Sequence, residues 1–183
     1  MWGAVVDRDG RLCALSASTD DKAATWPGSR AIAIAKASTS NAFSSDVAPM
    51  STARLYTLSQ PGHSLWGAAN GNPLNPLCLG AADDVTTGIG QVCGGTIAFG
   101  GGLALYKGQI RVGGLGVSGD TACADHEIAK RVRLAAGLAP TGLPSDEIIY
   151  TAADGASPFA HPLCPNTFRD GNKIGDESPA AGY

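Results

Sequence analysis

The chain has 183 residues, of which 44% are hydrophobic and only 16% are charged. This length predicts one domain, and so low a charged share excludes an intrinsically disordered chain. The net charge is −3, and no basic run exceeds two residues, so we expect no nucleic-acid partner, because tracking a phosphate backbone needs a basic stripe. No apolar run reaches the ~18 residues of a membrane span, so we expect no membrane partner either.

The first predicted element is a β-hairpin. Two apolar runs, Trp2–Val6 and Leu12–Leu15, flank the sequence Asp7-Arg8-Asp9-Gly10. An aspartate–glycine pair between two apolar runs is a strong hairpin signal. Because Met1 leads directly into a strand, we expect either that a leader or an N-terminal helix has been removed or that the start was redefined.

Two helices are predicted next. Residues 30 to 43 contain neither glycine nor proline, and small or apolar residues recur there at helical spacing. Ser29 is a suitable N-cap for this helix. A shorter helix is predicted from Ser51 to Ser59, and the segment from His63 to Gly90 is predicted to be a long irregular loop with a functional role.

A glycine-rich hairpin is predicted to form the middle of the sheet. Its first strand, Gly95–Phe99, is interrupted by three glycines and continues as Leu103–Tyr106, and the chain returns along Gln109–Val117. Glycines 113 and 114 inside the returning strand indicate a bulge or the close approach of another group. Residues 118–121 then cap a helix that runs to Ala136.

The remaining chain is rich in loops, with one edge strand predicted within Glu147–Thr151. The order of elements predicts an α/β (α+β) fold with a mainly antiparallel sheet of about five strands. We expect a single domain over residues 1–164 and a mobile C-terminal tail over residues 165–183.

Five cysteines constrain the fold further. Cys13 lies in an apolar strand and is predicted to be a buried free thiol. The other four allow three connectivities, of which we favour Cys78 with Cys93 and Cys123 with Cys164. Two disulfides indicate an oxidising compartment, so a secreted or periplasmic location is expected.

A zinc site is the alternative to the second disulfide. The spacings Cys123-x-x-His126 and His161-x-x-Cys164 are mirror images and supply the two thiolates and two imidazoles of a Cys₂His₂ site. The sequence does not decide between the disulfide and the zinc site, although the disulfide without a metal is the preferred hypothesis.

Several motifs carry a family resemblance when taken in order. They are Gly28–Ala37 followed by Asn41–Phe43, then Phe99–Tyr106, then Gly113–Asp120, with Asp125 and Ile128-Ala129 in the helix that follows. Over about Trp2 to Arg133 the chain resembles the GlcG/HbpS-like family of haem-associated domains. The resemblance implies a profilin-like fold of α/β/α layers, homo-oligomers that are dimers or larger, and haem or a related tetrapyrrole as ligand in some members. It also implies haem degradation or redox sensing in a few members, while the helix that usually precedes the first strand is missing here.

A ligand cleft is expected where the helix from Arg30, the glycine segment and the start of the last helix meet. The candidate binding residues are Arg30, Lys36, Asn41, Gly101, Gly102, Asp120, Asp125 and His126. Arg30 or Lys36 would pair with the carboxylate of a small acid or a haem propionate. None of His63, His126 and His161 stands out as an axial haem ligand, and no catalytic residue is identified.

Three functions remain open from the sequence. The leading one is an oligomeric small-molecule-binding protein, with haem as the possible cofactor and a possible redox or haem-degrading role. The second is an enzyme acting on a small carboxylated metabolite, in which the long loop is a lid and Lys36, Asp120 or His126 performs acid–base work. The third is a structural assembly module without a ligand.

Overall fold

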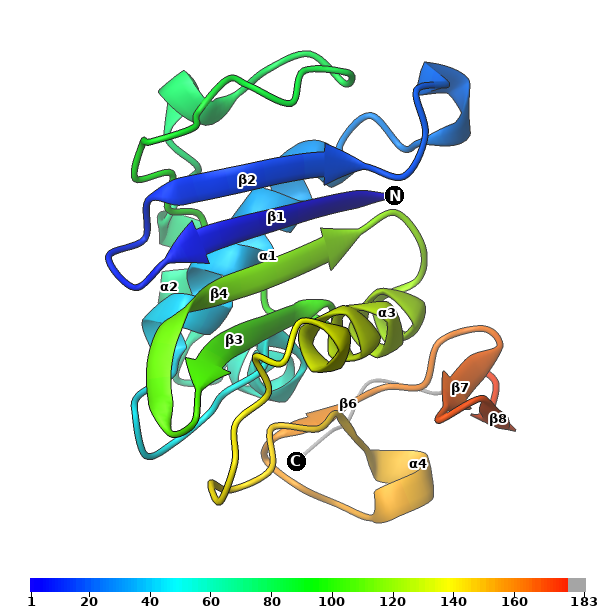
Figure 1. Ribbon diagram of the computed structural model, residues 1–183. Coiled ribbons are helices and arrows are strands. Elements are labelled where there is room, and N and C mark those ends of the chain that lie inside the picture. The colour runs from blue at the N-terminus through cyan, green and yellow to red at the C-terminus, as the bar shows by residue number, and fades with distance from the viewer. Residues whose placement is uncertain (178–183) are drawn as a thin grey trace.

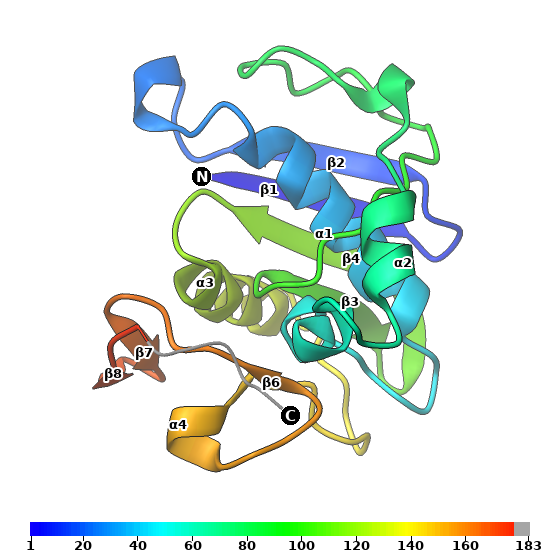
Figure 2. The same cartoon turned by 180° about the vertical axis from the view of Figure 1, so that it is seen from behind.

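The computed structural model describes residues 1–177 and arranges the chain in three layers (Figure 1). A four-stranded antiparallel sheet in the order β2-β1-β4-β3 lies between helix α1 on one face and helix α3 on the other (Figure 2). Its strands are β1 (Trp2–Asp7), β2 (Leu12–Ala17), β3 (Gly102–Lys107) and β4 (Ile110–Ser118). The predicted layered α/β fold with a mainly antiparallel sheet is confirmed.

The β1–β2 hairpin forms as its turn sequence predicts. Asp7 accepts hydrogen bonds from the backbone N–H groups of Asp9 and Arg11 through its carboxylate. Gly10 adopts a φ of +87°, a conformation that other residues rarely adopt. The turn therefore places β1 and β2 side by side. On its other edge, β1 pairs with β4.

Helix α1 (Ser29–Phe43) packs unusually close to the sheet. A Cβ atom added to Gly114 or Gly116 of β4 would collide with the backbone carbonyl of Ala37 or Ala33, respectively. The close approach predicted from the glycines of this strand is therefore the approach of the α1 backbone. Ser29 is the first residue of α1 rather than its N-cap, which is Gly28.

Helix α3 (Ala122–Ala135) covers the opposite face of the sheet. Thr121 caps it by accepting the backbone N–H of Ala124 at 3.3 Å. The core on this side consists of Ala129 from α3 and the sheet residues Leu103, Leu105, Leu115 and Val117. Helix α3 lies mainly over β3 and β4, so much of the sheet face on β1 and β2 is left uncovered by it (Figure 1).

Two predicted elements before the sheet centre are wrong. Gly95–Phe99 is not a strand, because Gly94 and Gly95 both have positive φ and the N–H of Ile97 donates to the Thr39 hydroxyl instead of a neighbouring strand. The helix predicted over Ser51–Ser59 is two 3-10 turns, Thr52–Leu55 and Thr57–Ser59. The glycine hairpin itself begins at Gly102, and its returning strand β4 is central while β3 is an edge strand.

The long loop contains the short helix α2 (Trp66–Gly71) and a 3-10 turn at Pro76–Cys78. Its last part runs along the β2 edge, where the N–H of Gly90 donates to the carbonyl of Leu12 at 2.8 Å. This contact covers part of an otherwise exposed sheet edge.

The C-terminal segment lies beside α3, away from the main sheet (Figures 1 and 2). Strand β5 (Ile149–Tyr150) pairs in parallel with β6 (Ala160–His161), and helix α4 (Thr151–Asp154) lies between them in the chain. The strand predicted within Glu147–Thr151 thus belongs to a separate small sheet, which leaves four strands in the main one.

Part of the expected tail is built into the fold. Strands β7 (Thr167–Arg169) and β8 (Asn172–Gly175) form a hairpin that contacts α3. Residues 178–183 of the expected tail lie outside the described residues. No helix in residues 1–177 is both long and apolar enough to span a membrane.

Candidate functional site

A buried ion pair lies at the centre of the region where the ligand cleft was expected. Lys36 Nζ lies 2.7 Å from Asp125 Oδ2 and donates a second hydrogen bond to the Val117 carbonyl at 2.9 Å. It also lies 4.8 Å from the ring centroid of Phe99. Burial lowers the pKa of Lys36 and raises the pKa of Asp125, while their mutual attraction opposes both shifts.

The glycine segment closes around this ion pair. A Cβ atom on Gly101 would come within 3 Å of Lys36 Nζ and of the Asp125 side chain, and one on Gly102 would overlap the Thr52 side chain. The structure therefore brings Lys36, Gly101, Gly102 and Asp125 together as predicted, but as packed interior. The expected cleft between them is filled.

Arg30 holds the long loop in place. Its guanidinium donates to three backbone carbonyls, those of Cys78, Asp84 and Thr87, at 2.8, 2.5 and 2.6 Å. The residue is only 2% exposed, so it is not free to pair with a ligand carboxylate.

Asn41 and Asp120 also make local contacts. The Asn41 side chain donates to the Arg8 carbonyl and accepts from the Arg111 guanidinium. Asp120 is exposed, and its carboxylate accepts the N–H of Thr121. The Asp120 N–H also donates to Asp125 Oδ1 at 3.0 Å, which places Asp120 beside the ion pair, whereas Arg30 and Asn41 make their contacts elsewhere.

His126 and His161 are both buried and neutral. Burial lowers the pKa of His126 to about 3 and that of His161 to about 4. His161 Nδ1 lies 2.7 Å from the Pro162 carbonyl, so it carries the proton, and Nε2 accepts the N–H of Gly100 at 3.3 Å. His126 Nδ1 is buried without a hydrogen-bond partner.

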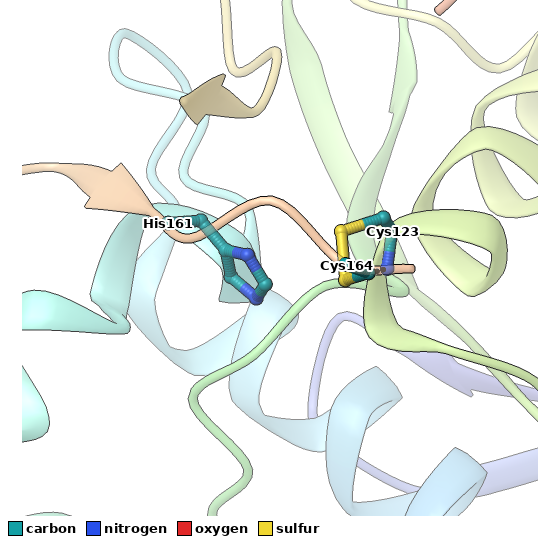
Figure 3. A group of neighbouring side chains, drawn as sticks. All are labelled: Cys123, His161 and Cys164. Carbon is teal, nitrogen blue, oxygen red and sulfur yellow. Dashed lines mark hydrogen bonds between the residues drawn. A yellow bond between two sulfur atoms is a disulfide. The ribbon is translucent and has the colours of Figure 1, made fainter. Parts of the chain in front are cut away.

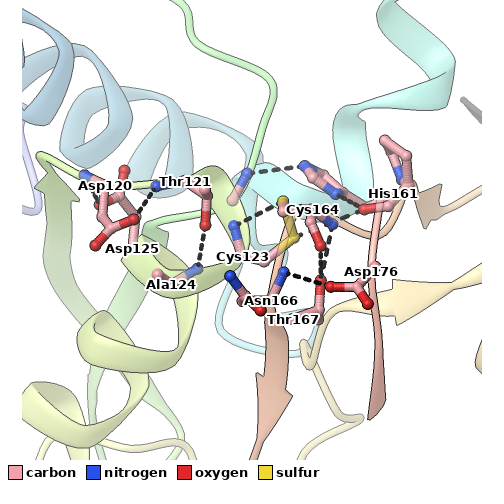
Figure 4. Close-up of a disulfide and its surroundings, with 12 residues drawn as sticks. Asp120, Thr121, Cys123, Ala124, Asp125, His161, Cys164, Asn166, Thr167 and Asp176 are labelled. Atoms are coloured by element: carbon pink, nitrogen blue, oxygen red, sulfur yellow. Dashed lines mark hydrogen bonds between the residues drawn. A yellow bond between two sulfur atoms is a disulfide. The ribbon is translucent and has the colours of Figure 1, made fainter. Parts of the chain in front are cut away.

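Both predicted disulfides are present. Cys78 is bonded to Cys93, and Cys123 on α3 is bonded to Cys164 in the C-terminal segment (Figure 4). The two bonds are compatible with an oxidising compartment. The prediction that Cys13 is buried is wrong, because it lies exposed on the edge strand β2, beside the register shift that interrupts the β1–β2 pairing.

An apolar hollow of about 300 Å³ lies where the uncovered part of the sheet meets α3. We call it the sheet groove, and it is lined by Met1, Trp2, Gly3, Ser16, Ala17, Ser18, Leu115, Val117, Ile128 and Val132. The groove was not among the predicted sites, although Ile128 and Val132 share a helix face at i,i+4 spacing and Gly3 pairs with Ser16 across two strands. The sheet wall of the groove therefore carries the small residues Gly3 and Ser16, and the α3 wall carries the branched apolar residues Ile128 and Val132.

Comparison with known proteins assigns the chain to a class of haem-associated proteins. The sequence model of the haem-degrading protein HbpS-like family matches residues 1–133. The chain belongs to this HbpS-like family. No curated protein sequence matches it.

Two solved structures share the fold. A crystal structure of a PduOC:haem complex is 25% identical, with a TM-score of 0.55, and the match covers 75% of this chain and 79% of that one. The Klebsiella pneumoniae protein ORFY, a DUF336 protein, is 24% identical, with a TM-score of 0.51 and coverage of 72% and 71%. The predicted family and its fold are thereby confirmed.

Proposed function

We propose that this protein binds haem or a related tetrapyrrole in the sheet groove. The observation that carries the proposal is membership of the HbpS-like family together with a 25% identical relative crystallised with haem. The groove supplies the apolar, concave surface that small-molecule sites need.

The shape of the groove suits a flat ligand. Gly3 and Ser16 give the sheet wall a low profile, and Val132 on α3 forms the facing wall with 46% of its surface exposed. No histidine is among the lining residues. Apolar contact, rather than a histidine–iron bond, would therefore carry most of the affinity.

Haem titration tests this proposal. We expect a Soret shift and quenching of tryptophan fluorescence at micromolar haem, since Trp2 borders the groove. Val132→Glu should weaken binding at least about tenfold, because it places a carboxylate against an apolar ligand. The matched control is Leu134→Glu, which adds the same charge to an exposed residue of the same helix outside the groove. No Soret shift, or equal loss in both variants, contradicts the proposal.

We further propose that the protein degrades the bound haem or acts on it in a redox reaction. The haem-loaded protein, given a reductant and oxygen, should lose its Soret band and yield an open-chain tetrapyrrole. A Soret band that persists under these conditions assigns the protein to binding alone.

Self-association is proposed from the long loop. Five large apolar side chains are exposed there, namely Trp66, Leu77, Leu79, Val85 and Ile89. Exposed apolar clusters of this kind usually mark an interface, and we assign this one to a second copy of the chain. Light scattering should give a mass at least twice the 18.4 kDa of one chain, and Leu77→Asp with Leu79→Asp should reduce it. A monomeric mass for the unaltered protein contradicts this part.

The alternative of an enzyme acting on a small carboxylated metabolite has less support. It assigned acid–base roles to Lys36, Asp120 and His126, but Lys36 and His126 are buried in the interior.

An oxidising location, secreted or periplasmic, is proposed from the two disulfides. Counting one free thiol in protein isolated without reductant would support it, and five would contradict it.

A further inference from the structure

A cluster of potential metal ligands lies between α3 and the C-terminal segment, separate from the sheet groove. The Sγ atoms of Cys123 and Cys164 and a ring nitrogen of His161 all lie within 4.8 Å of one another (Figure 3). The two sulfur atoms form a disulfide in this structure. The same three side chains, with the disulfide reduced, would offer two thiolates and one imidazole.

His161 is already arranged as metal-ligating histidines usually are. Its Nδ1–H donates to a backbone carbonyl, that of Pro162, and this contact fixes the tautomer that leaves the Nε2 lone pair available. Nε2 accepts only a long hydrogen bond, 3.3 Å from the N–H of Gly100. A metal ion at Nε2 would therefore replace a weak contact.

His126 lies outside this group of three ligand atoms, but it provides a second, independent indication. It is 1% exposed and lies one helical turn after Cys123, and its Nδ1 has no hydrogen-bond partner. A buried unpartnered nitrogen is costly unless it serves a purpose. His126 also flanks Gly100, the residue whose N–H bonds to His161, because a Cβ on Gly100 would lie 3.1 Å from the His126 Cβ.

We propose that reduction of the Cys123–Cys164 disulfide converts this cluster into a Zn²⁺ site with Cys123, Cys164 and His161 as ligands, and that His126, which lies outside the cluster, is recruited as the fourth ligand. A dithiol reductant supplies two electrons and two protons, its own two sulfurs become a disulfide, and the Cys123–Cys164 bond is cleaved to two thiols. Binding of Zn²⁺ then releases the two thiol protons to solvent, leaving a tetrahedral Cys₂His₂ site.

The other disulfide offers a built-in comparison. Cys78 and Cys93 also yield two thiols on reduction, but the described residues place no histidine in a ligand cluster with them. Reduction should therefore create a site at one disulfide and not at the other. Because Cys13 is an exposed thiol that could bind metal by itself, the experiment uses the full-length chain carrying Cys13→Ser.

The probe is Co²⁺, followed by competition with Zn²⁺. After reduction by a phosphine under anaerobic conditions, we expect one Co²⁺ per chain, with tetrahedral d–d bands and thiolate-to-cobalt charge-transfer absorbance. The unreduced chain should show neither. His161→Ala and His126→Ala should each weaken Co²⁺ binding by more than the 10–100-fold typical of losing a second-shell partner.

Protection from alkylation tests the same site without depending on how a variant folds. In the reduced chain, Zn²⁺ should slow alkylation of Cys123 and Cys164 at least tenfold and leave Cys78 and Cys93 unprotected, as read by peptide mass spectrometry. Equal protection of both pairs, or a reduced chain without thiolate-to-cobalt absorbance, overturns the proposal. Unchanged affinity in His126→Ala overturns the assignment of the fourth ligand.

Discussion

Lys36 on α1 and Asp125 on α3 form a 2.7 Å ion pair that joins the two helices covering opposite faces of the sheet. Both side chains are almost fully buried, at 0% and 2% exposure. Removing one partner leaves an unpaired charge in the interior, which is far more costly than losing the pair itself.

Lys36→Met should therefore lower the free energy of unfolding by about 3–5 kcal/mol, as measured by urea denaturation. Adding Asp125→Asn to it should recover part of the loss, because the remaining charge is then removed. The control is Lys22→Met, which breaks an exposed ion pair with Asp83 and should have little effect on stability, because water screens such pairs. Similar losses in the two lysine variants would show that Lys36 is not held in the interior.

Stability should fall steeply between pH 6.5 and pH 4. The pKa values of His126 and His161, about 3 and about 4 in the fold, lie below the ordinary value of 6.5. In this window the unfolded chain binds protons that the folded chain cannot, so acid favours unfolding. Each histidine should cost about 2 kcal/mol at pH 5 relative to pH 7.5.

The pH effect is measured as the urea midpoint at pH 7.5 and at pH 5. His126→Leu should lose roughly half of the difference between the two values. Burial raises the pKa of Asp125, so its protonation in acid favours the folded state and opposes the effect of the histidines. The difference between the unaltered protein and His126→Leu is therefore more informative than the pH dependence of the unaltered protein alone. A variant with an unchanged pH dependence would contradict the burial of a neutral His126.

Gly116→Ala should unfold the protein or destabilise it by at least about 3 kcal/mol. The added methyl group would overlap the Ala33 carbonyl of α1. Gly3→Ala is the matched control on the neighbouring strand β1, since a Cβ there meets nothing within 4 Å. Its midpoint should stay within about 0.5 kcal/mol of the unaltered protein, and a large loss at Gly3 would contradict the described packing.

The disulfides should contribute unequally. Loop closure over sequence separations of 15 and 41 residues predicts about 3 kcal/mol for Cys78–Cys93 and about 4 kcal/mol for Cys123–Cys164. Replacing Cys123 and Cys164 by alanine should also expose residues 139–177 to limited proteolysis, while the sheet remains resistant. Cleavage within the sheet at the same rate would show that the C-terminal segment is not a separate unit.

The hairpin from Trp2 and the helix over residues 30 to 43 could be predicted from the sequence, because each depends on a local pattern. The favoured pairing of the four cysteines was also correct, although the sequence left a zinc site open in place of the second disulfide. Gly95–Phe99 could not be recognised as irregular. Its apolar composition suits a strand, but its partner is the Thr39 hydroxyl on a distant helix. Likewise, the exposure of Cys13 follows from the edge position of β2, which depends on the strand order and not on its apolar neighbours.

The site was harder to predict than the fold. Lys36, Gly101 and Asp125 do meet in space, but the sequence does not tell whether converging polar residues enclose a cleft or each other. In the structure the Lys36 and Asp125 charges pair with each other in the interior, and Gly101 packs against them so closely that no space remains for a ligand. The sheet groove was missed because its walls are small and apolar residues without a chemical signature.

Arg30 gives the long loop a fixed centre that is part of the chain itself. Three carbonyl oxygens from one loop converge on its guanidinium, in the way that loops of many extracellular proteins converge on a bound calcium ion. A covalently attached cation cannot dissociate or be chelated. The chain itself therefore holds these three carbonyl groups together, where other proteins use a bound metal ion.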